Sequence, residues 1–526
     1  MPQTAPRRQR RLVLLGFLGV LALALVVRVP GMGMSLWLDE GLSVGIASHP
    51  LADIPGLLRQ DGSPPLYYLV LHGWMEAFGR SEEAVRALSL LFGLACIPVF
   101  FWAARSLFGR RAGWIAAVLA ASNPYLGAYS REGRMYTLLV LLCLVAVTAF
   151  VHALVFGRRR WVPVLAVALA LALYTHNWGL YLGVGLGMAA IVCVVAADDR
   201  RRVVLDAATA FGGAGLLYVP WLPTLVAQAR RTGAPWSETP GAAQLFGPLK
   251  SVVGDDAVMV IVVLAALPAL VVAGRRWRGG GTGLGFVALA VSVVGTLVIA
   301  WTSSQVEPAW ATRYFGVFVP PLLLLMALGL AREGRRGLVA LALIVVVWTD
   351  LGQWPEVPRK SNMRAAVELV ADRMEPGDLV VSTHMEHVPL LRYYLGPDLR
   401  YADPSGLVAD PTLADWRDGL ERVRAATPEQ GLTPLVEVLP NGARLLLACP
   451  RLDLDEDTLE WFRLMAGHCR SWRRALDGNP TMTLVDGPAS PTPRRSPGSS
   501  IFLMVYEKHG AGGGAGGPQA PLTSAR

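Results

Sequence analysis

Two adjacent carboxylates, Asp39 and Glu40, follow Trp37 a few residues beyond the first apolar block of the chain. A carboxylate near hydrocarbon is costly to keep charged, at about 2.5–3.5 kcal/mol for the bilayer centre. The presence of two carboxylates at this position therefore calls for an explanation. The pair is therefore either a solvated loop pair or the acidic part of a functional site.

Arginines form the second set of residues that could take part in substrate binding or catalysis. Arg131 and Arg134 lie in one short loop, three residues apart, and would share a face if the segment is helical. Two such guanidiniums suit a phosphate group, although either could pair with Glu132 or another carboxylate. Arg313 opens a later apolar block, where it would reach lipid phosphates or hold a substrate phosphate.

Other candidates occur in two polar segments. Asp61, Pro64, Pro65 and Tyr67 belong to one, and His176 belongs to the other, directly after an apolar block. The Pro-Pro pair fixes an extended entry to a helix, so the first segment also fits a turn before an interfacial helix. His176 also fits a histidine whose hydrogen bonds are satisfied at the membrane interface.

Apolar blocks fill the first two thirds of the chain and must position these side chains. Hydrophobic residues make up 53% of the sequence and charged residues 17%, against about 25% charged in soluble domains. We predict a polytopic helical bundle of about eleven spans, the third and fifth of them short. The blocks are residues 12–30, 84–104, 112–124, 135–156, 161–173, 179–197, 203–221, 257–273, 282–301, 314–331 and 337–351.

Arginine clusters mark every second loop between the blocks, as the positive-inside rule requires. This arrangement explains the net charge of +9 better than nucleic-acid binding does. It predicts a multi-pass protein of the cell (plasma) membrane with its N-terminus inside. The loops after spans 1, 3, 5, 7 and 9, and the chain after span 11, then face outward. A cleaved signal peptide is the alternative for the first block.

The first outer loop, residues 31–83, is too long for a simple turn. Residues 51–60 and 66–78 are amphipathic, and the second segment holds Tyr67, Tyr68, Trp74 and Phe78. Aromatic residues of this kind favour the membrane interface, so we expect two helices along the outer surface.

After the last block the pattern changes to that of a small α/β domain, residues 353–508, which we place outside the cell with residues 1–352 as the membrane domain. We expect helices over 365–374, 388–395 and 458–467. Strands are expected over 379–382, 444–448, 482–485 and 501–507. Residues 487–500 fit a floppy insertion, and residues 509–526 fit a disordered tail.

The five cysteines divide by position. Cys96, Cys143 and Cys193 lie inside apolar blocks and fit small core residues. Cys449 follows a predicted strand and Cys469 follows the next predicted helix, and we predict a disulfide between them if the domain is extracytoplasmic. Buried free thiols are the alternative.

The order of these features resembles the glycosyltransferase C superfamily, and within it the bacterial glycosyltransferase family 39 proteins, relatives of protein O-mannosyltransferases and the lipid A aminoarabinose transferase. The resemblance covers about residues 10–350. The matching motifs are Trp37-Leu38-Asp39-Glu40, Pro64-Pro65-Leu66-Tyr67-Tyr68, RSLFGRR (105–111), Ser122-Asn123-Pro124, YSREGRMY (129–136), Thr175-His176-Asn177-Trp178 and Arg313-Tyr314. The family usually has a histidine before the Pro-Pro pair, where this chain has Ser63.

The resemblance implies an enzyme, a membrane glycosyltransferase that moves a hexosyl or pentosyl group from a polyprenyl-phosphate donor to an acceptor hydroxyl at the outer face, with inversion. Asp39 matches the catalytic position, and Glu40 would assist. We predict that the phosphate or substrate is bound by Arg131, Arg134, Arg313, Tyr67, His176 and Asp61. The acceptor would be an envelope glycan, lipid or protein. No tight His/Cys spacing appears, so we predict no metal site and no cofactor, with a divalent cation the alternative.

A transporter or flippase for a lipid or solute is the rival prediction, and a non-catalytic envelope-assembly subunit is another. A transporter should carry inverted repeats and charges near the middle of its helices. In this sequence the notable charges lie at the outer ends of the blocks, and a soluble domain follows. Both features favour the enzyme.

Overall fold

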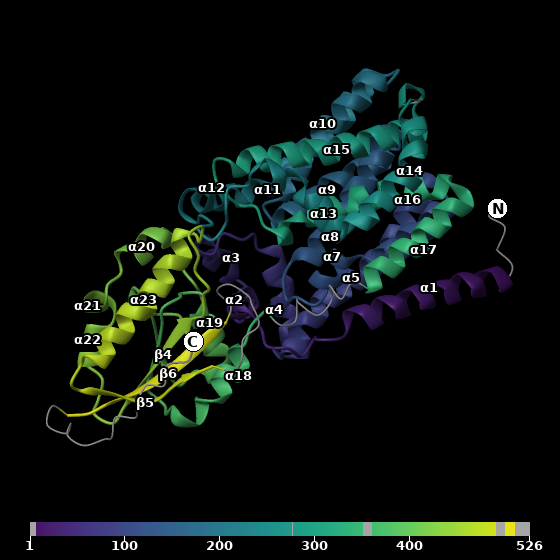
Figure 1. The fold of residues 1–526 in the computed structure, drawn as a ribbon. Helices are drawn as coiled ribbons and strands as arrows, with labels where there is room; N and C mark the ends of the chain where they lie inside the picture. The colour runs from purple at the N-terminus through teal and green to yellow at the C-terminus, as the bar shows by residue number, and fades with distance from the viewer. Residues whose placement is uncertain (1–6, 276, 351–359, 491–499, 511–526) are drawn as a thin grey trace. The chain divides into compact units, whose positions relative to one another are not determined.

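The computed structural model describes the chain except for residues 1–6, 276, 351–359, 491–499 and 511–526 (Figure 1). The chain forms two compact units. The membrane unit contains Met1–Met34 and Ile46–Arg359, and the C-terminal unit contains Ser35–Gly45 and Lys360–Arg526. The short segment Ser35–Gly45 therefore belongs with residues more than three hundred positions away in the sequence.

Every predicted apolar block of the membrane unit coincides with a helix, because long apolar runs satisfy their backbone hydrogen bonds within the segment. These helices are α1 (Arg7–Arg28), α5 (Glu82–Phe108), α6 (Arg110–Ser122), α8 (Tyr136–Phe150), α9 (Val162–Thr175), α10 (Gly179–Ala196), α11 (Arg200–Tyr218), α14 (Asp256–Arg275), α15 (Gly281–Ser304), α16 (Val319–Arg332) and α17 (Gly334–Asp350).

Among the described residues, six helices are long and apolar enough to cross a membrane, or seven if one bent pair counts as a span. The predicted eleven spans include helices of 13 and 14 residues, α6 and α9, which are shorter than a typical crossing. The polytopic helical bundle is confirmed, whereas the number of crossings stays a prediction.

Small residues bring neighbouring helices together in this unit. Helices α10 and α15 lie side by side along their length (Figure 1). Gly185 of α10 faces Ser292 and Thr296 of α15, and Gly295 of α15 lies against Gly185, so larger side chains at either glycine would overlap the opposite helix. Close backbone approach of this kind is the usual way in which membrane helices gain packing contacts.

Shorter helices connect the long ones. The first outer loop contains α2 (Leu38–Ala47), α3 (Ile54–Leu57), a 3-10 turn (Leu58–Gln60) and α4 (Leu66–Phe78), so the predicted helix over residues 66–78 is confirmed. Helices α7 (Pro124–Tyr129), α12 (Leu222–Arg231) and α13 (Gly247–Val253) were not predicted. Asn123 starts α7 by accepting the Leu126 backbone N–H at 3.1 Å, with Pro124 in the first turn.

The C-terminal unit is built on a six-stranded sheet in the order β3-β2-β1-β4-β6-β5. The strands are β1 (Leu379–Ser382), β2 (Arg400–Asp403), β3 (Gly406–Leu407), β4 (Arg444–Pro450), β5 (Met482–Ala489) and β6 (Ile501–Lys508). Strand β1 runs parallel to β2 and β4, and β6 runs antiparallel to β4 and β5. The predicted α/β class is confirmed.

Helices α18 (Met363–Glu368), α19 (His387–Leu395), α20 (Gly419–Ala425), α21 (Pro428–Gly431), α22 (Thr433–Glu437) and α23 (Glu460–Asp477) complete this unit. Helix α23 packs on β4 and β5, and its buried Trp472 joins a core with Leu445, Leu447 and Tyr506. The helix extends ten residues past its predicted end at residue 467 because its apolar face continues through Trp472 and Leu476.

The predicted insertion over residues 487–500 is partly wrong, because Gly487–Ala489 continue strand β5 beside β6. Residues 491–499 of that insertion, and residues 511–526 of the predicted tail, lie outside the described residues. Cys449 at the end of β4 and Cys469 in α23 form a disulfide with their Cα atoms 5.5 Å apart.

Candidate active site

The loop that carries Arg131 and Arg134 is a tight turn between α7 and α8, not a helix. The predicted helical face shared by the two arginines is therefore wrong. Both side chains are buried, with 3% and 8% of their surface exposed. They also have different hydrogen-bond partners, and phosphate binding stays a prediction for both.

Arg134 belongs to a polar network that includes the first outer loop. Its Nη1 donates to the Tyr68 hydroxyl at 3.1 Å, and that hydroxyl donates to Asp61 Oδ2 at 3.2 Å. Burial raises the pKa of Tyr68, so the phenol stays protonated and links the carboxylate to the guanidinium. The Ser89 hydroxyl donates to the Arg134 backbone carbonyl at 2.9 Å and fixes the turn.

Tyr67 lies on the same helix, α4, and its side chain is fully buried. Its hydroxyl is 3.3 Å from Ser89 Oγ on α5. Ser89 in turn holds the Arg134 backbone, so Tyr67 acts on the arginine loop through a serine. A role in binding phosphate stays a prediction for Tyr67, whereas Tyr68 contacts the guanidinium itself.

His176 caps the C-terminal end of α9 and lies among the cations of this region. Burial, and the charges of Arg134 and Arg313, lower the pKa of His176 to about 3. The ring is therefore neutral at physiological pH. Its Nδ1 accepts the Trp178 backbone N–H at 3.1 Å, which leaves the ring proton on Nε2, where it can be donated.

Aromatic rings surround the same histidine. The Tyr314 ring centroid lies 4.7 Å from that of His176, and the Tyr136 centroid lies 6.1 Å away. The Arg313 guanidinium lies 4.3 Å from the Trp236 ring centroid and 5.3 Å from the Tyr314 ring centroid. Such cation–π contacts hold a guanidinium in place without neutralising its charge.

Arg131 lies with two other arginines instead. Its Nη1 donates to the Pro30 carbonyl at 3.3 Å, and Arg86 Nη1 donates to the carbonyls of Met32 and Met34 at 2.8 and 2.5 Å. Burial, with the nearby charge of Arg86, lowers the pKa of Arg131 to about 10. These contacts fix the segment that follows α1.

Arg28 at the end of α1 is fully buried and supports the same region. Its guanidinium donates to the carbonyls of Gly93, Ala120 and Ala121 at 2.8, 2.5 and 3.3 Å. Sequence reasoning assigned no role to Arg28, Arg86 or Tyr68. A signal existed for the two arginines, since each lies inside a predicted apolar block, where a charged residue needs partners.

Asp39 and Glu40 lie in the first turn of α2, within the C-terminal unit. Glu40 is fully buried, and its Oε2 accepts the Trp37 backbone N–H at 3.2 Å. This contact is the carboxylate half of a capping box and starts the helix. Asp39 is half-buried, and its backbone carbonyl accepts the Ser43 hydroxyl at 2.8 Å. Catalysis by Asp39 stays a prediction.

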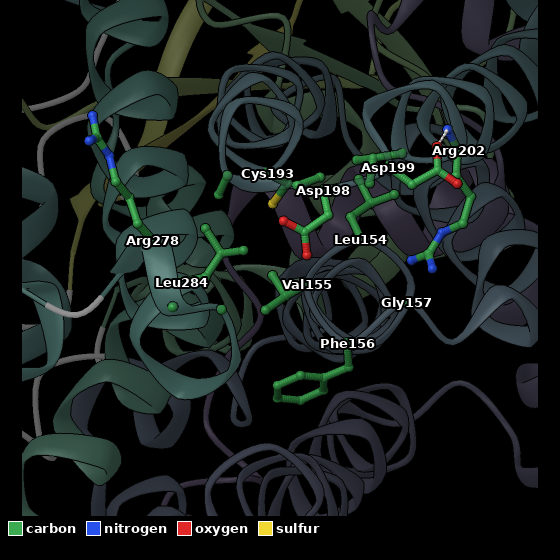
Figure 2. Close-up of a pocket in the computed structure, with 15 residues that line it drawn as sticks. Leu154, Val155, Phe156, Gly157, Cys193, Asp198, Asp199, Arg202, Arg278 and Leu284 are labelled. Carbon is green, nitrogen blue, oxygen red and sulfur yellow. Dashed lines mark hydrogen bonds between the residues drawn. The ribbon is translucent and has the colours of Figure 1, made fainter.

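A pocket of about 530 Å³ lies at the opposite end of α10 from His176. The 18 residues of α10 place this pocket about 27 Å from the histidine end. Figure 2 shows the Asp198 carboxylate pointing into the pocket between apolar side chains, while the Arg278 guanidinium points away. Asp199 instead accepts the Arg202 backbone N–H at 3.0 Å and starts α11. None of the predicted site residues lines this pocket.

Among the described residues, no group of three or more His, Cys, Asp or Glu side chains could hold a metal ion. The arrangement around His176 instead offers two guanidiniums, a neutral imidazole and aromatic rings. Charge-assisted hydrogen bonds from such groups bind phosphate oxygens.

Comparison with known proteins identifies the fold. The family model of dolichyl-phosphate-mannose-protein mannosyltransferases matches residues 62–226. No curated protein sequence matches this chain. The segment that is similar to this family contains Tyr68, Arg134 and His176.

Solved structures match over almost the whole chain. ArnT from Cupriavidus metallidurans in the apo state is 16% identical, with a TM-score of 0.63 over 95% of this chain and 98% of that chain. The same protein bound to undecaprenyl phosphate has a TM-score of 0.60 at 16% identity, over 93% and 97% of the two chains.

A third match is the archaeal oligosaccharyltransferase AglB from Archaeoglobus fulgidus in complex with an inhibitory peptide and a dolichol-phosphate. It is 12% identical, with a TM-score of 0.57 over 93% of this chain and 75% of that chain. These likenesses show that the chain has the glycosyltransferase C fold, as its sequence motifs predict.

Proposed function

We propose that this chain is a membrane glycosyltransferase that transfers a sugar from a polyprenyl-phosphate donor to an acceptor hydroxyl. The observation that carries the proposal is that the Tyr314 ring contacts both the His176 ring, at 4.7 Å, and the Arg313 guanidinium, at 5.3 Å. The charges of Arg134 and Arg313 also help to lower the pKa of this histidine. Two structures of the same fold support it, since one contains undecaprenyl phosphate and the other a dolichol-phosphate.

The leaving group of the proposed reaction is a lipid phosphate, on which negative charge grows in the transition state. Cations fixed before the reaction stabilise such charge without reorganising. Arg134 is held by Tyr68, and Arg313 by Trp236, so both guanidiniums are oriented in advance. The Nε2 proton of His176 would donate a further hydrogen bond to a phosphate oxygen.

Asp39 is the proposed general base that takes the proton of the acceptor hydroxyl as its oxygen attacks the anomeric carbon. The bond from that carbon to the phosphate oxygen breaks, and direct displacement inverts the configuration. Glu40 supports this step by holding the start of α2 through its bond to Trp37.

The finer assignments belong to the same proposal. The transferred group is a hexose or pentose, and the acceptor is an envelope glycan, lipid or protein. The proposal includes no resident cofactor, and a divalent cation is the alternative. The protein lies in the cell membrane with the C-terminal unit outside. The rival prediction is a transporter, which should carry inverted repeats and charges near the middle of its helices.

The function is tested by incubating purified protein with a panel of radiolabelled polyprenyl-phosphate sugars and envelope acceptors. We expect transfer from one donor and loss of that transfer in Arg134→Gln. Binding of every donor without release of free polyprenyl phosphate would contradict the proposal and favour a transporter.

The location of the C-terminal unit is tested with Gly514→Cys, labelled by a membrane-impermeant thiol reagent in intact cells. The wild-type chain is the matched control, since Cys96, Cys143 and Cys193 are buried and Cys449 and Cys469 are bonded. Labelling of the variant only after cell lysis would place the unit inside.

A further inference from the structure

Helix α2, which carries Asp39, is divided between the two units. The chain leaves the membrane unit at Met34 and returns to it at Ile46. The intervening segment Ser35–Gly45, here called the carboxylate segment, belongs to the C-terminal unit. The proposed base is therefore held by the soluble part of the protein, although it lies in a loop between membrane helices in the sequence.

Hydrogen bonds hold the first residues of the carboxylate segment. The Leu36 backbone N–H donates to the Tyr394 hydroxyl at 2.8 Å, and Ser35 Oγ is 3.4 Å from the same hydroxyl. The Arg364 backbone N–H donates to Ser35 Oγ at 3.2 Å. Tyr394 lies in α19 and Arg364 in α18, so two helices of the C-terminal unit fix the entry to α2.

A cation reinforces this entry. Lys360 Nζ lies 4.1 Å from the centroid of the Trp37 ring, directly before α2. Trp37 is also the residue whose backbone N–H donates to Glu40. Trp37, directly before the helix, is thus held by Lys360, which lies outside α2, and by Glu40, which lies within α2.

Two glycines fix the rest of the helix. Gly41 and Gly45 lie four residues apart and share one face of α2. A methyl group at Gly41 would lie 2.8 Å from Leu390 Cδ1 and 3.1 Å from Leu390 Cα in α19. A methyl group at Gly45 would overlap the Thr412 backbone carbonyl oxygen. The helix backbone therefore touches the C-terminal unit at two points, one turn apart.

These glycines act against helix formation, because glycine is the poorest helix former apart from proline. Two of them in a ten-residue helix weaken it, while the close approach they permit sets its distance and rotation. Asp39 lies half a turn from Gly41, so its carboxylate moves with any shift of this contact. A helix that packed only through apolar side chains would be less restricted in its distance and rotation.

We propose that the C-terminal unit positions the Asp39 carboxylate, with Tyr394, Gly41 and Gly45 as positioning residues. This inference rests on the proposed function of Asp39 as general base. Misplacement of a reacting group by 1 Å can cost about 10²-fold in rate. A unit that fixes α2 by its side-chain hydroxyl and by backbone contact supplies that precision.

The first test uses Tyr394→Phe, which removes only the hydroxyl that accepts the Leu36 N–H. We expect faster hydrogen–deuterium exchange in residues 35–45 and about a tenfold lower kcat for transfer, with unchanged donor affinity. The matched control is Tyr401→Phe, which removes a hydroxyl that donates to the Gly396 carbonyl at 2.7 Å within the same unit. The control should match the wild type in exchange and kcat.

The second test compares single methyl groups on two helices of the first outer loop. Gly45→Ala should lower kcat by about tenfold to a hundredfold because the Thr412 carbonyl oxygen is backbone. Gly73→Ala in α4 is the control, since a Cβ there meets nothing within 4 Å, and its kcat should stay at the wild-type value. Intact mass of the unreduced protein checks that both variants keep the disulfide.

The outcomes separate the two proposals. Wild-type protein that transfers no sugar from any donor would overturn the proposed function. Active wild-type protein whose Tyr394→Phe and Gly45→Ala variants keep normal kcat would overturn only the positioning role. Unchanged exchange in residues 35–45 of Tyr394→Phe would also overturn it, whether or not a donor has been found.

Discussion

The two units hold their functional candidates by different means. In the membrane unit, Arg134 and Arg313 are fixed by side-chain groups, a phenol and an indole ring. In the C-terminal unit, α2 is fixed largely through its backbone, at Leu36 and at two glycines. The two arginines proposed to bind phosphate are thus held by contacts of their side chains, whereas the helix of the proposed base is held mainly by contacts of its main chain.

The largest expected effect concerns the carboxylate segment. Asp39→Asn should insert and fold normally but lose about 10²–10⁴ in turnover, because the base is removed while the hydrogen bonds of Trp37 and Ser43 remain. Transfer is measured with the active donor, and donor affinity should be unchanged. Turnover near the wild-type rate would remove Asp39 from the mechanism.

Removal of the disulfide tests whether the stability of the C-terminal unit is independent of donor binding in the membrane unit. Its loop spans 20 residues, so Cys449→Ala with Cys469→Ala should lower the free energy of unfolding of the C-terminal unit by about 3 kcal/mol. Pulse proteolysis measures this loss, and donor affinity in the membrane unit should remain unchanged. Separate alkylated Cys449 and Cys469 peptides from unreduced wild-type protein would instead show that the bond does not form.

The third prediction compares the contributions of Arg131 and Arg134 to donor affinity. Arg134→Gln should weaken donor binding by about tenfold to a hundredfold, as expected for a charged hydrogen bond of about 1.5–3 kcal/mol. Arg131→Gln is the matched control and should keep donor affinity near the wild type, because Arg131 bonds the Pro30 carbonyl. Equal losses in equilibrium binding assays would mean that both arginines hold the phosphate.

The smallest expected effect is that of pH on donor affinity through His176. Its pKa is about 3 in the folded protein and about 6.5 when unfolded, so the ring stays neutral in the site from pH 5 to 8. Its contribution to stability is fully present above pH 6.5 and is lost as the pH falls from 6.5 toward 3.

Donor affinity should therefore show the same pH profile in wild type and His176→Gln between pH 5 and 8. Isothermal titration with a sugar phosphodiester donor is suitable, since the diester itself does not titrate in this range. A step near pH 6.5 in the wild type alone would indicate that the histidine becomes charged in the site.

The sequence predicts the helices and strands with strong periodicity and fails where long-range contacts decide. The run of apolar residues around Leu379 and Leu445 predicts two strands correctly. Strand β2, with Arg400 and Asp403 at its ends, has no such run and forms because β1 offers a parallel edge. Helix α2 has the same difficulty, since its two glycines argue against a helix until Leu390 and Thr412 are beside them.

Site prediction shows the same division. Arg134 and His176 can be recognised as polar residues at the ends of apolar blocks, and in the structure the charge of Arg134 helps to lower the pKa of His176. The separate environment of Arg131 depends on Arg86 and on carbonyls after α1, which no local pattern connects. Tyr68 and Tyr67 are adjacent in sequence, and only the packing of α4 decides which of them reaches a guanidinium.

The division of the chain at Met34 and Ile46 has a consequence for engineering. A chimera that exchanges everything after residue 359 for the soluble part of a relative would pair a foreign α19 with the native glycines of α2. Such a graft would lose the matched surfaces at Leu390 and Thr412. The transplantable module is discontinuous, and residues 35–45 must be carried with the C-terminal unit for the hybrid to keep its proposed base in register.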